Sequence, residues 1–190
     1  MTSVRILWLL IGLSWVIAEI RLIRKTATED KDVAHGENQS QRWLWLSVVV
    51  SVCLAMVFKA LAWLPIRIDY MPRQWLALLL FSIGLSLRYW AVLKLGRFFS
   101  THVLIQNKHQ LITDGPYRWI RHPAYTGLLI AFAGAGLAMG DVFALLLLTV
   151  LPFFAFKARI SLEEKKLIKQ FGRQYLDYLN KTYKLLPLLY

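Results

Sequence analysis

The chain has 190 residues, of which 57% are hydrophobic and 14% aromatic, and its formal net charge at pH 7 is +12. A soluble domain holds about 45–50% apolar residues, and the excess here lies in blocks long enough to cross a bilayer, which takes about 20 residues. The basic residues flank these blocks, which favours membrane lipids over nucleic acid as a partner. The single cysteine, Cys53, excludes an intrachain disulfide. The composition indicates a small integral membrane protein with one domain over residues 1–190.

Five apolar segments predict five membrane-spanning helices. They are Val4–Ile20, Trp43–Leu64, Gln74–Leu93, Pro123–Met139 and Val142–Phe156. No small-residue cleavage site follows the first segment, so we interpret it as a retained helix and not as a signal peptide. The polar residues Arg21–Arg42 are expected to form a loop to the second span. The fourth and fifth spans are joined by the short turn Gly140-Asp141, which predicts a tight helical hairpin.

The last part of the chain, Lys157–Lys184, is charged and amphipathic. Apolar side chains recur every four residues at Leu167, Phe171, Tyr175 and Leu179, which predicts a helix with one apolar face at the membrane surface. The expected fold is therefore all-α: a polytopic membrane protein with about five transmembrane helices plus a C-terminal amphipathic cytosolic helix.

The distribution of Lys and Arg predicts the orientation of these helices. The connections after the first and third spans and the C-terminal segment together hold 18 basic residues, whereas the other side holds three, Arg5, Arg67 and Arg73. Because basic loops stay in the cytoplasm, we expect the N-terminus outside and the C-terminus inside.

The polar stretch Leu111–Gly127 precedes the fourth span and is rich in turn residues. Gly115-Pro116 marks a turn, and Pro123 suits the first position of a helix. Arg121, His122 and Tyr125 then lie at a helix N-terminus, where unpaired backbone N–H groups can receive an anionic or polar ligand. A basic membrane-flanking cluster and an interfacial aromatic belt are the alternative interpretations.

Three other charged residues are candidates for chemistry. Arg159 and Glu163 are four residues apart, so on a helix they share a face, although spacing alone fits a surface ion pair better. Arg88 lies within the third span, where an Arg is either functional or directed to the headgroups. We expect the cluster at 118–125 and the cluster at 159–164 to close over one cofactor.

Several common sites have no signal in the sequence. There is no dinucleotide-binding or Walker motif, and no Gly-x-Ser-x-Gly. The four histidines lack the spacing of a zinc site, so no metal is expected. The absence of a base–nucleophile pair argues against hydrolysis.

The segment Arg121-His122-Pro123-Ala124-Tyr125-Thr126-Gly127 resembles the Arg-His-Pro-x-Tyr-x-Gly motif of the isoprenylcysteine carboxyl methyltransferase family, which is related to the membrane phospholipid N-methyltransferases. A second family element resembles Glu163-Glu164, Leu167, Phe171-Gly172, Tyr175 and Tyr178, followed by Leu186-Pro187. The resemblance covers about residues 96–187, which would form the cofactor-binding and catalytic region after the N-terminal spans, 1–95. It implies methyl transfer from S-adenosyl-L-methionine, with S-adenosyl-L-homocysteine as product, at the cytosolic membrane face.

The resemblance also implies site residues. The cofactor pocket would be lined by Gln110, Leu111, Ile112, Tyr117, Arg121, His122, Tyr125, Gly127, Glu163 and Glu164, with the two glutamates holding the cofactor's amino group. The catalytic candidates are Arg159, Arg88 and His102. Arg88, Arg97 or Arg159 would pair with a substrate carboxylate, and Arg159 could instead bind the cofactor's carboxylate. His102 or Glu163 would serve as the base for an amine acceptor.

The preferred function is O-methylation of a carboxylate or hydroxyl on a lipid-like or prenylated substrate. The alternatives are a phospholipid (phosphatidylethanolamine) N-methyltransferase and a non-catalytic membrane scaffold of the same fold. A transporter would show an internal repeat, and none is evident. The oligomeric state and the identity of the acceptor stay open.

Overall fold

The computed structural model describes residues 2–29, 35–99 and 111–185. In these ranges the chain forms six α-helices and two short 3-10 helices. They are α1 (Thr2–Glu29), α2 (His35–Leu61), α3 (Tyr70–Leu95), η1 (Gly96–Phe98), η2 (Gly115–Arg118), α4 (Pro123–Met139), α5 (Val142–Phe171) and α6 (Arg173–Leu179). The β-pairing in the described ranges is limited to two isolated bridges, so the all-α prediction is confirmed.

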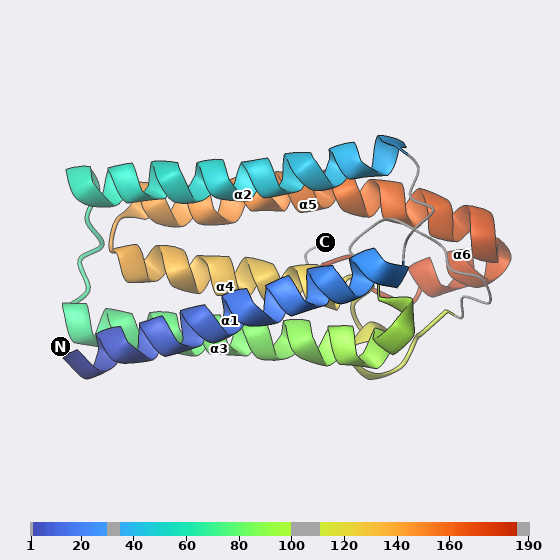
Figure 1. Ribbon diagram of the computed structural model, residues 1–190, viewed down its shortest axis with the longest axis horizontal. Helices are drawn as coiled ribbons and strands as arrows, with labels where there is room; N and C mark the ends of the chain where they lie inside the picture. Colours follow the sequence, from blue (N-terminus) through green and yellow to red (C-terminus); the bar gives the residue numbers. More distant parts are fainter. Residues whose placement is uncertain (1, 30–34, 100–110, 186–190) are drawn as a thin grey trace.

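Four helices are long and apolar enough to cross a membrane: Ser3–Arg24, Gln41–Leu61, Tyr70–Leu95 and Val142–Phe171. The fifth apolar helix, α4, has 17 residues. Figure 1 shows these helices along the length of the bundle, with α2 beside α5 and with α1 crossing α3. The short helices η2 and α6 lie together at one end. The predicted polytopic architecture is confirmed.

Two boundaries differ from the prediction. The expected loop Arg21–Arg42 is largely helical, because α1 continues to Glu29 and α2 begins at His35. Hydropathy detects only the lipid-crossing part of a helix, and residues 21–29 contain neither Gly nor Pro to end it. Likewise α5 passes the expected end at Phe156 and continues to Phe171, so the amphipathic segment is the end of α5 followed by α6.

The backbones of α3 and α4 are in direct contact at two glycines. A Cβ atom added at Gly84 would lie 2.5 Å from the Gly127 carbonyl oxygen, and one at Gly127 would lie 2.7 Å from the Arg88 nitrogen. Small residues allow the two backbones to approach this closely. The resulting van der Waals contact stabilises the helix pair, since burying apolar surface between helices brings no hydrophobic gain in lipid. The contact brings Arg88 close to the first turn of α4.

The turn between α4 and α5 is fixed by Asp141. Its Oδ1 accepts hydrogen bonds from the nitrogens of Phe143 (2.8 Å) and Ala144 (3.2 Å), as an N-cap does, and its Oδ2 accepts one from the Leu64 nitrogen at 2.8 Å. Gly140 adopts a φ of 81°, which suits a residue without Cβ. The predicted helical hairpin is confirmed, and it is also tied to the end of α2.

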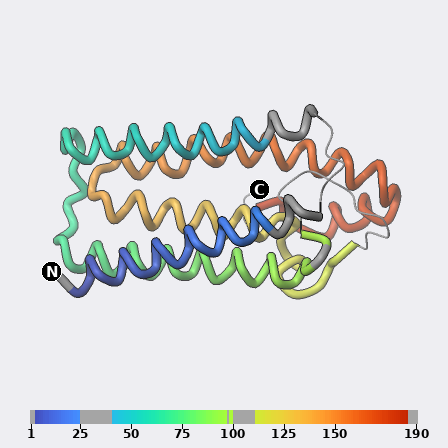
Figure 2. Tube along the Cα trace, in the orientation of Figure 1, coloured from blue at the N-terminus to red at the C-terminus, as the bar shows by residue number. Residues whose placement is uncertain are grey.

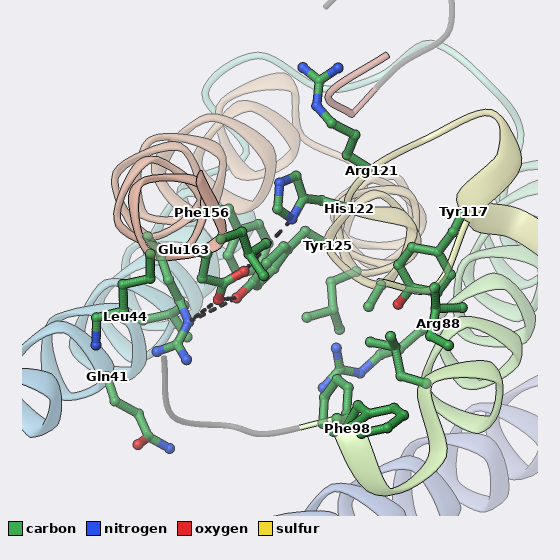
Figure 3. A pocket seen from close by; sticks show the side chains of 18 of the residues that line it. Gln41, Leu44, Arg88, Phe98, Tyr117, Arg121, His122, Tyr125, Phe156 and Glu163 are labelled. Atoms are coloured by element: carbon green, nitrogen blue, oxygen red, sulfur yellow. Dashed lines mark hydrogen bonds and ion pairs between the residues drawn. The ribbon is translucent and has the colours of Figure 1, made fainter. Parts of the chain in front are cut away.

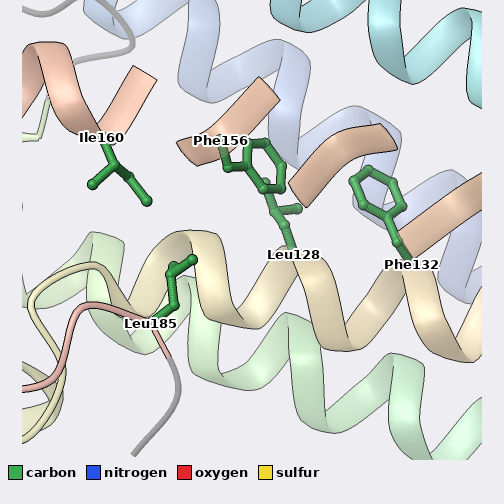
Figure 4. Packing of buried hydrophobic residues seen from close by; sticks show 5 residues of the cluster. All are labelled: Leu128, Phe132, Phe156, Ile160 and Leu185. Atoms are coloured by element: carbon green, nitrogen blue, oxygen red, sulfur yellow. The ribbon is translucent and has the colours of Figure 1, made fainter. Parts of the chain in front are cut away.

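An apolar cluster joins α4, α5 and the C-terminal segment. Figure 4 shows Leu128 and Phe132 from α4 packed toward Phe156 and Ile160 from α5, with Leu185 beside them. Leu185 is fully buried, so the segment after α6 returns to the bundle, as Figure 2 shows. We call residues 180–185 the terminal strap.

The helix contact predicts that Gly84→Ala destabilises the protein by about 2 kcal/mol, since the added methyl group overlaps the backbone of α4. Thermal unfolding in detergent measures the change. Gly12→Ala is the matched control, because no atom lies within 4 Å of a Cβ at Gly12. Equal stability of the two variants would contradict the described packing.

Candidate functional site

A cavity lies at the end of the bundle where α4 begins, and residues from α1 to α6 line it. Apolar and aromatic side chains form much of its wall, among them Trp15, Leu44, Trp45, Phe98, Leu128 and Phe132. Figure 3 shows a polar side formed by Glu163 and Tyr125, with Arg88 reaching in from α3 across from them. The cavity thus combines an apolar wall with a small set of charged groups, which is typical of a ligand site.

Local turn chemistry positions the first wall of this cavity. Gly115, with a φ of 60°, begins η2 and Pro116 follows it in the first turn, which buries Tyr117 against α3. The Tyr117 hydroxyl donates to the Ala91 carbonyl at 3.4 Å, and the Tyr178 hydroxyl donates to the Tyr117 carbonyl at 2.6 Å. Burial raises the pKa of both tyrosines above the ordinary value, so both hydroxyls stay protonated and act as donors.

The central polar group is Arg159, Tyr125 and Glu163. Arg159 Nε donates to the Tyr125 oxygen at 2.8 Å and to Glu163 Oε1 at 3.1 Å, and the Tyr125 hydroxyl donates to the same carboxylate oxygen. The predicted pairing of Arg159 with Glu163 is therefore present. It is not a surface ion pair, because the side chains are only 5% and 20% exposed. A charge pair that is buried to this extent and also shares a tyrosine hydroxyl keeps a fixed geometry.

His122 lies between the two glutamates at the N-terminus of α4. Its Nδ1 is 3.7 Å from Glu163 Oε2, and its Nε2 is 3.3 Å from Glu164 Oε1. The ring is 7% exposed. His122 thereby links the start of α4 to the carboxylates of Glu163 and Glu164 in α5. The clusters at 118–125 and 159–164 are thus in contact, as expected from the sequence.

Arg121 and Glu164 face the terminal strap. Arg121 Nε donates to Glu164 Oε1 at 3.0 Å, and its Nη1 donates to the carbonyls of Leu179 and Thr182. Lys184 Nζ lies 3.1 Å from Glu164 Oε2. Arg121 is among the residues that line the cavity and Glu164 is not, but Figure 3 shows the Arg121 guanidinium pointing away from Glu163 and Tyr125. The contacts of both side chains hold the fold around the site.

Arg88 forms an ion pair that sequence reasoning missed. Its Nε and Nη2 each lie 2.6 Å from one carboxylate oxygen of Glu19 on α1, and the Tyr89 hydroxyl donates to Glu19 at 3.2 Å. Both Arg88 and Glu19 are 7% exposed and line the cavity. The sequence did contain a signal for this pair. It has an acid near the end of one apolar span and an arginine within another, and charges buried in a membrane need partners.

The remaining candidates divide into three groups. Leu111, Ile112 and Tyr117 line the cavity. Gly127 instead packs against the backbone of α3. His102 and Gln110 lie outside the described residues. Among the residues that the structure describes, no group of three or more His, Cys, Asp and Glu side chains could hold a metal ion.

The strap contacts predict a structural effect of Arg121→Lys. A lysine cannot reproduce the forked contacts to Glu164 and the strap carbonyls, so we expect the Tyr183 amide, which donates to the Trp119 carbonyl at 3.0 Å, to exchange at least ten times faster. Hydrogen exchange measured by mass spectrometry reports this protection. Arg118→Lys, at an exposed position of η2, is the control. Unchanged protection in Arg121→Lys would show that the strap does not depend on Arg121.

Comparisons with known proteins agree with this architecture. The model of the isoprenylcysteine carboxyl methyltransferase (ICMT) family matches residues 75–169. A probable protein-S-isoprenylcysteine O-methyltransferase of Oryza sativa subsp. japonica is 35% identical over 124 residues, 64% of each chain. The protein-S-isoprenylcysteine O-methyltransferase of Schizosaccharomyces pombe is 30% identical over 80% of this chain and 69% of its own.

A solved structure is also similar. It is that of the eukaryotic intramembrane Ras methyltransferase ICMT, with a TM-score of 0.58 and 26% identity over 85% of this chain and 56% of that one. The match thus spans less than two thirds of the rice relative and of the solved chain. The family model nevertheless covers half of the sequence, and the chain belongs to the isoprenylcysteine carboxyl methyltransferase family.

Proposed function

We propose that this protein is an S-adenosylmethionine-dependent membrane methyltransferase that esterifies the carboxylate of a prenylated or lipid-like acceptor. The observation that carries the proposal is the buried Arg159–Tyr125–Glu163 group at the polar side of a largely apolar cavity. Relatives in the family are named protein-S-isoprenylcysteine O-methyltransferases, which supports a carboxylate on a prenylated group as the acceptor.

The cavity residues suit this cofactor chemically. S-adenosylmethionine carries an ammonium, a carboxylate and a sulfonium, so its site needs an acidic and a basic anchor together. Glu163 would hold the ammonium and Arg159 the carboxylate, while Leu111, Ile112 and Tyr117 would line the nucleoside. When bound, the cofactor supplies a methyl group on a positively charged sulfur, which a carboxylate can attack without a strong base.

The protein's part in this reaction is to position and desolvate the reactants. In-line methyl transfer depends mainly on how the donor and acceptor are held. The group around Tyr125 is fixed by hydrogen bonds, and buried apolar residues such as Leu128 and Phe156 exclude water beneath it. A carboxylate acceptor has no proton to lose, so the residues need only orient it and compensate its charge.

The alternatives fit less well. An amine acceptor such as phosphatidylethanolamine must lose a proton and would require a base, and the similar proteins reported above are named as O-methyltransferases. A non-catalytic scaffold needs no charge cluster beside a cavity, and burying charges costs free energy. We therefore favour O-methylation over both.

We further propose that the cavity faces the cytoplasm and that the chain acts as one domain. The connections after the first and third predicted spans and the C-terminal segment hold 18 basic residues in the sequence, which supports a cytoplasmic location of the cavity under the positive-inside rule. Because α1 and α2 contribute to the same cavity as α3 to α6, residues 1–95 and 96–187 would form one functional unit with the N-terminus outside.

The two glutamates should differ when each is changed to glutamine. Glu163→Gln removes the proposed partner of the cofactor's ammonium, so we expect S-adenosylhomocysteine to bind at least ten times more weakly. Glu164→Gln loosens the strap contacts and should lower the melting temperature while changing affinity less than about threefold. Titration calorimetry and thermal unfolding of both detergent-purified variants measure this. Undiminished affinity in Glu163→Gln would defeat the assignment of the pocket.

Arg159→Ala should lower turnover by more than about 100-fold, which corresponds to about 3 kcal/mol for loss of a buried charge-assisted contact. Transfer of labelled methyl groups to an S-prenylcysteine acid measures the rate. Lys165→Ala is the control, because Lys165 is an exposed cation on the same helix. Equal rates in the two variants would reduce Arg159 to a structural charge.

A further inference from the structure

We infer that Glu19 binds Arg88 at the position that the acceptor's carboxylate takes during the reaction. The site thereby selects acids, because an acid is able to displace Glu19 from Arg88. The inference rests on the proposed function and names a determinant of its acceptor class. In the described structure the Arg88 guanidinium is engaged by Glu19 through two contacts of 2.6 Å, one to each oxygen. This forked geometry is the one that guanidinium groups form with any carboxylate.

The pair lies where an acceptor's head group would have to lie. Arg88 and Glu19 both line the cavity, and Figure 3 shows Arg88 directed into it from α3, opposite Tyr125 and Glu163. The acidic group on the other wall, Glu163, is already paired with Arg159. Arg121, which also lines the cavity, is paired with Glu164. We therefore assign Arg88 as the arginine that an acceptor carboxylate reaches by exchange with Glu19, while Glu163 and Arg159 serve the cofactor.

Glu19 belongs to the helix that is least enclosed by the bundle. Only 6% of the apolar window of α1 is buried, against 44% for α3. Towards the other end of α1, the Trp8 Nε1–H donates to Gln74 at 2.8 Å. Because apolar contacts between helices bring no hydrophobic gain in lipid, polar contacts such as these have a large share in holding α1 in place. Trp8 and Trp15 also pack on Phe81 of α3, so these aromatic contacts can hold α1 while the Glu19 side chain turns away from Arg88.

Charge balance explains why the exchange would be selective. A carboxylate that replaces Glu19 leaves the buried Arg88 neutralised, so the exchange does not create an unpaired buried charge. A carboxamide or hydroxyl would leave Arg88 uncompensated, and an ammonium would be repelled. Glu19 lies five residues before Arg24, where the candidate membrane span of α1 ends, so a displaced Glu19 has the headgroup region nearby. The arrangement therefore favours acids over amines and neutral lipids.

The test compares two probes, an S-prenylcysteine with a free carboxylate and the same molecule as its carboxamide. Calorimetry in detergent measures their binding to the full-length protein, both with S-adenosylhomocysteine and without any cofactor. We expect the wild type to prefer the acid. Glu19→Gln should bind the acid at least ten times more tightly and the amide as before, because Arg88 is then unoccupied by a carboxylate. The Glu19→Gln/Arg88→Gln double variant should bind both probes alike.

Gln74→Leu is the matched control, since it removes the polar contact with Trp8 of α1, together with the Gln74 contact to the Ala138 carbonyl of α4, without touching Arg88. It should leave the preference for acid over amide unchanged. The inference is overturned if Glu19→Gln weakens acid binding, if Gln74→Leu reproduces its effect, or if the double variant keeps the preference. Thermal unfolding shows whether Glu19→Gln is folded. If it is not, the double variant, which has no unpaired charge, tests the inference through its preference for the acid or the amide.

The same design separates this inference from the proposed function. Binding of the two probes needs no methyl transfer, so the contrast between acid and amide is measured even if no turnover occurs. Absence of S-adenosylhomocysteine binding in the wild type would contradict the proposed function alone. If the wild type binds the cofactor and turns over but does not prefer the acid to the amide, only the role of Glu19 is contradicted.

Discussion

The close contact between the backbones of α3 and α4 is the constraint on which the site depends. Gly84 and Gly127 allow the two helices to touch, and a side chain at either position would strike the backbone of the other helix. Tyr125 lies two residues before Gly127, and Arg88 lies one helical turn after Gly84. The contact therefore sets the separation between the wall that carries Arg88 and the wall that carries Tyr125. A wider spacing would open the cavity to lipid, and it would separate the groups that we propose contact the cofactor and the acceptor.

Compensation of charge is the second organising feature. Two of the described arginines are buried at this cavity, and each is paired with a carboxylate. Arg159 pairs with Glu163 one turn further along α5, and Arg88 of α3 pairs with Glu19 of α1. Both pairs carry a tyrosine hydroxyl, from Tyr125 in the first and Tyr89 in the second. In a low-dielectric setting such pairs keep their geometry because separating them is costly. A ligand that brings its own ammonium or carboxylate can exchange partners with them at little cost, which suits a site that, in our proposal, accepts both a zwitterionic cofactor and an acidic acceptor.

The sequence predicted the bundle well, because long apolar segments and the lysines and arginines between them are strong signals. It also predicted that Arg159 and Glu163 would pair and that the start of α4 would meet the end of α5. It could not indicate the direction of each side chain within a motif: Arg121 shares a motif with His122, yet its guanidinium holds the terminal strap. Nor could it find Glu19 as the partner of Arg88, since pairing between residues 69 positions apart depends on how α1 crosses α3. The ends of α1 and α2 beyond the membrane were missed because polar helices carry no hydropathy signal.

The chemical form of the transferred methyl group tests the account most directly. The protein would be placed in vesicles that contain phosphatidylethanolamine together with an S-prenylcysteine acid, and supplied with S-adenosylmethionine labelled in its methyl group. A carboxylate acceptor yields a methyl ester, which mild alkali hydrolyses to volatile methanol, whereas a methylated amine keeps its label under the same treatment. The account predicts label that is released by alkali and that is found on the prenylcysteine. Label that resists alkali and remains with the phosphatidylethanolamine fraction would contradict it.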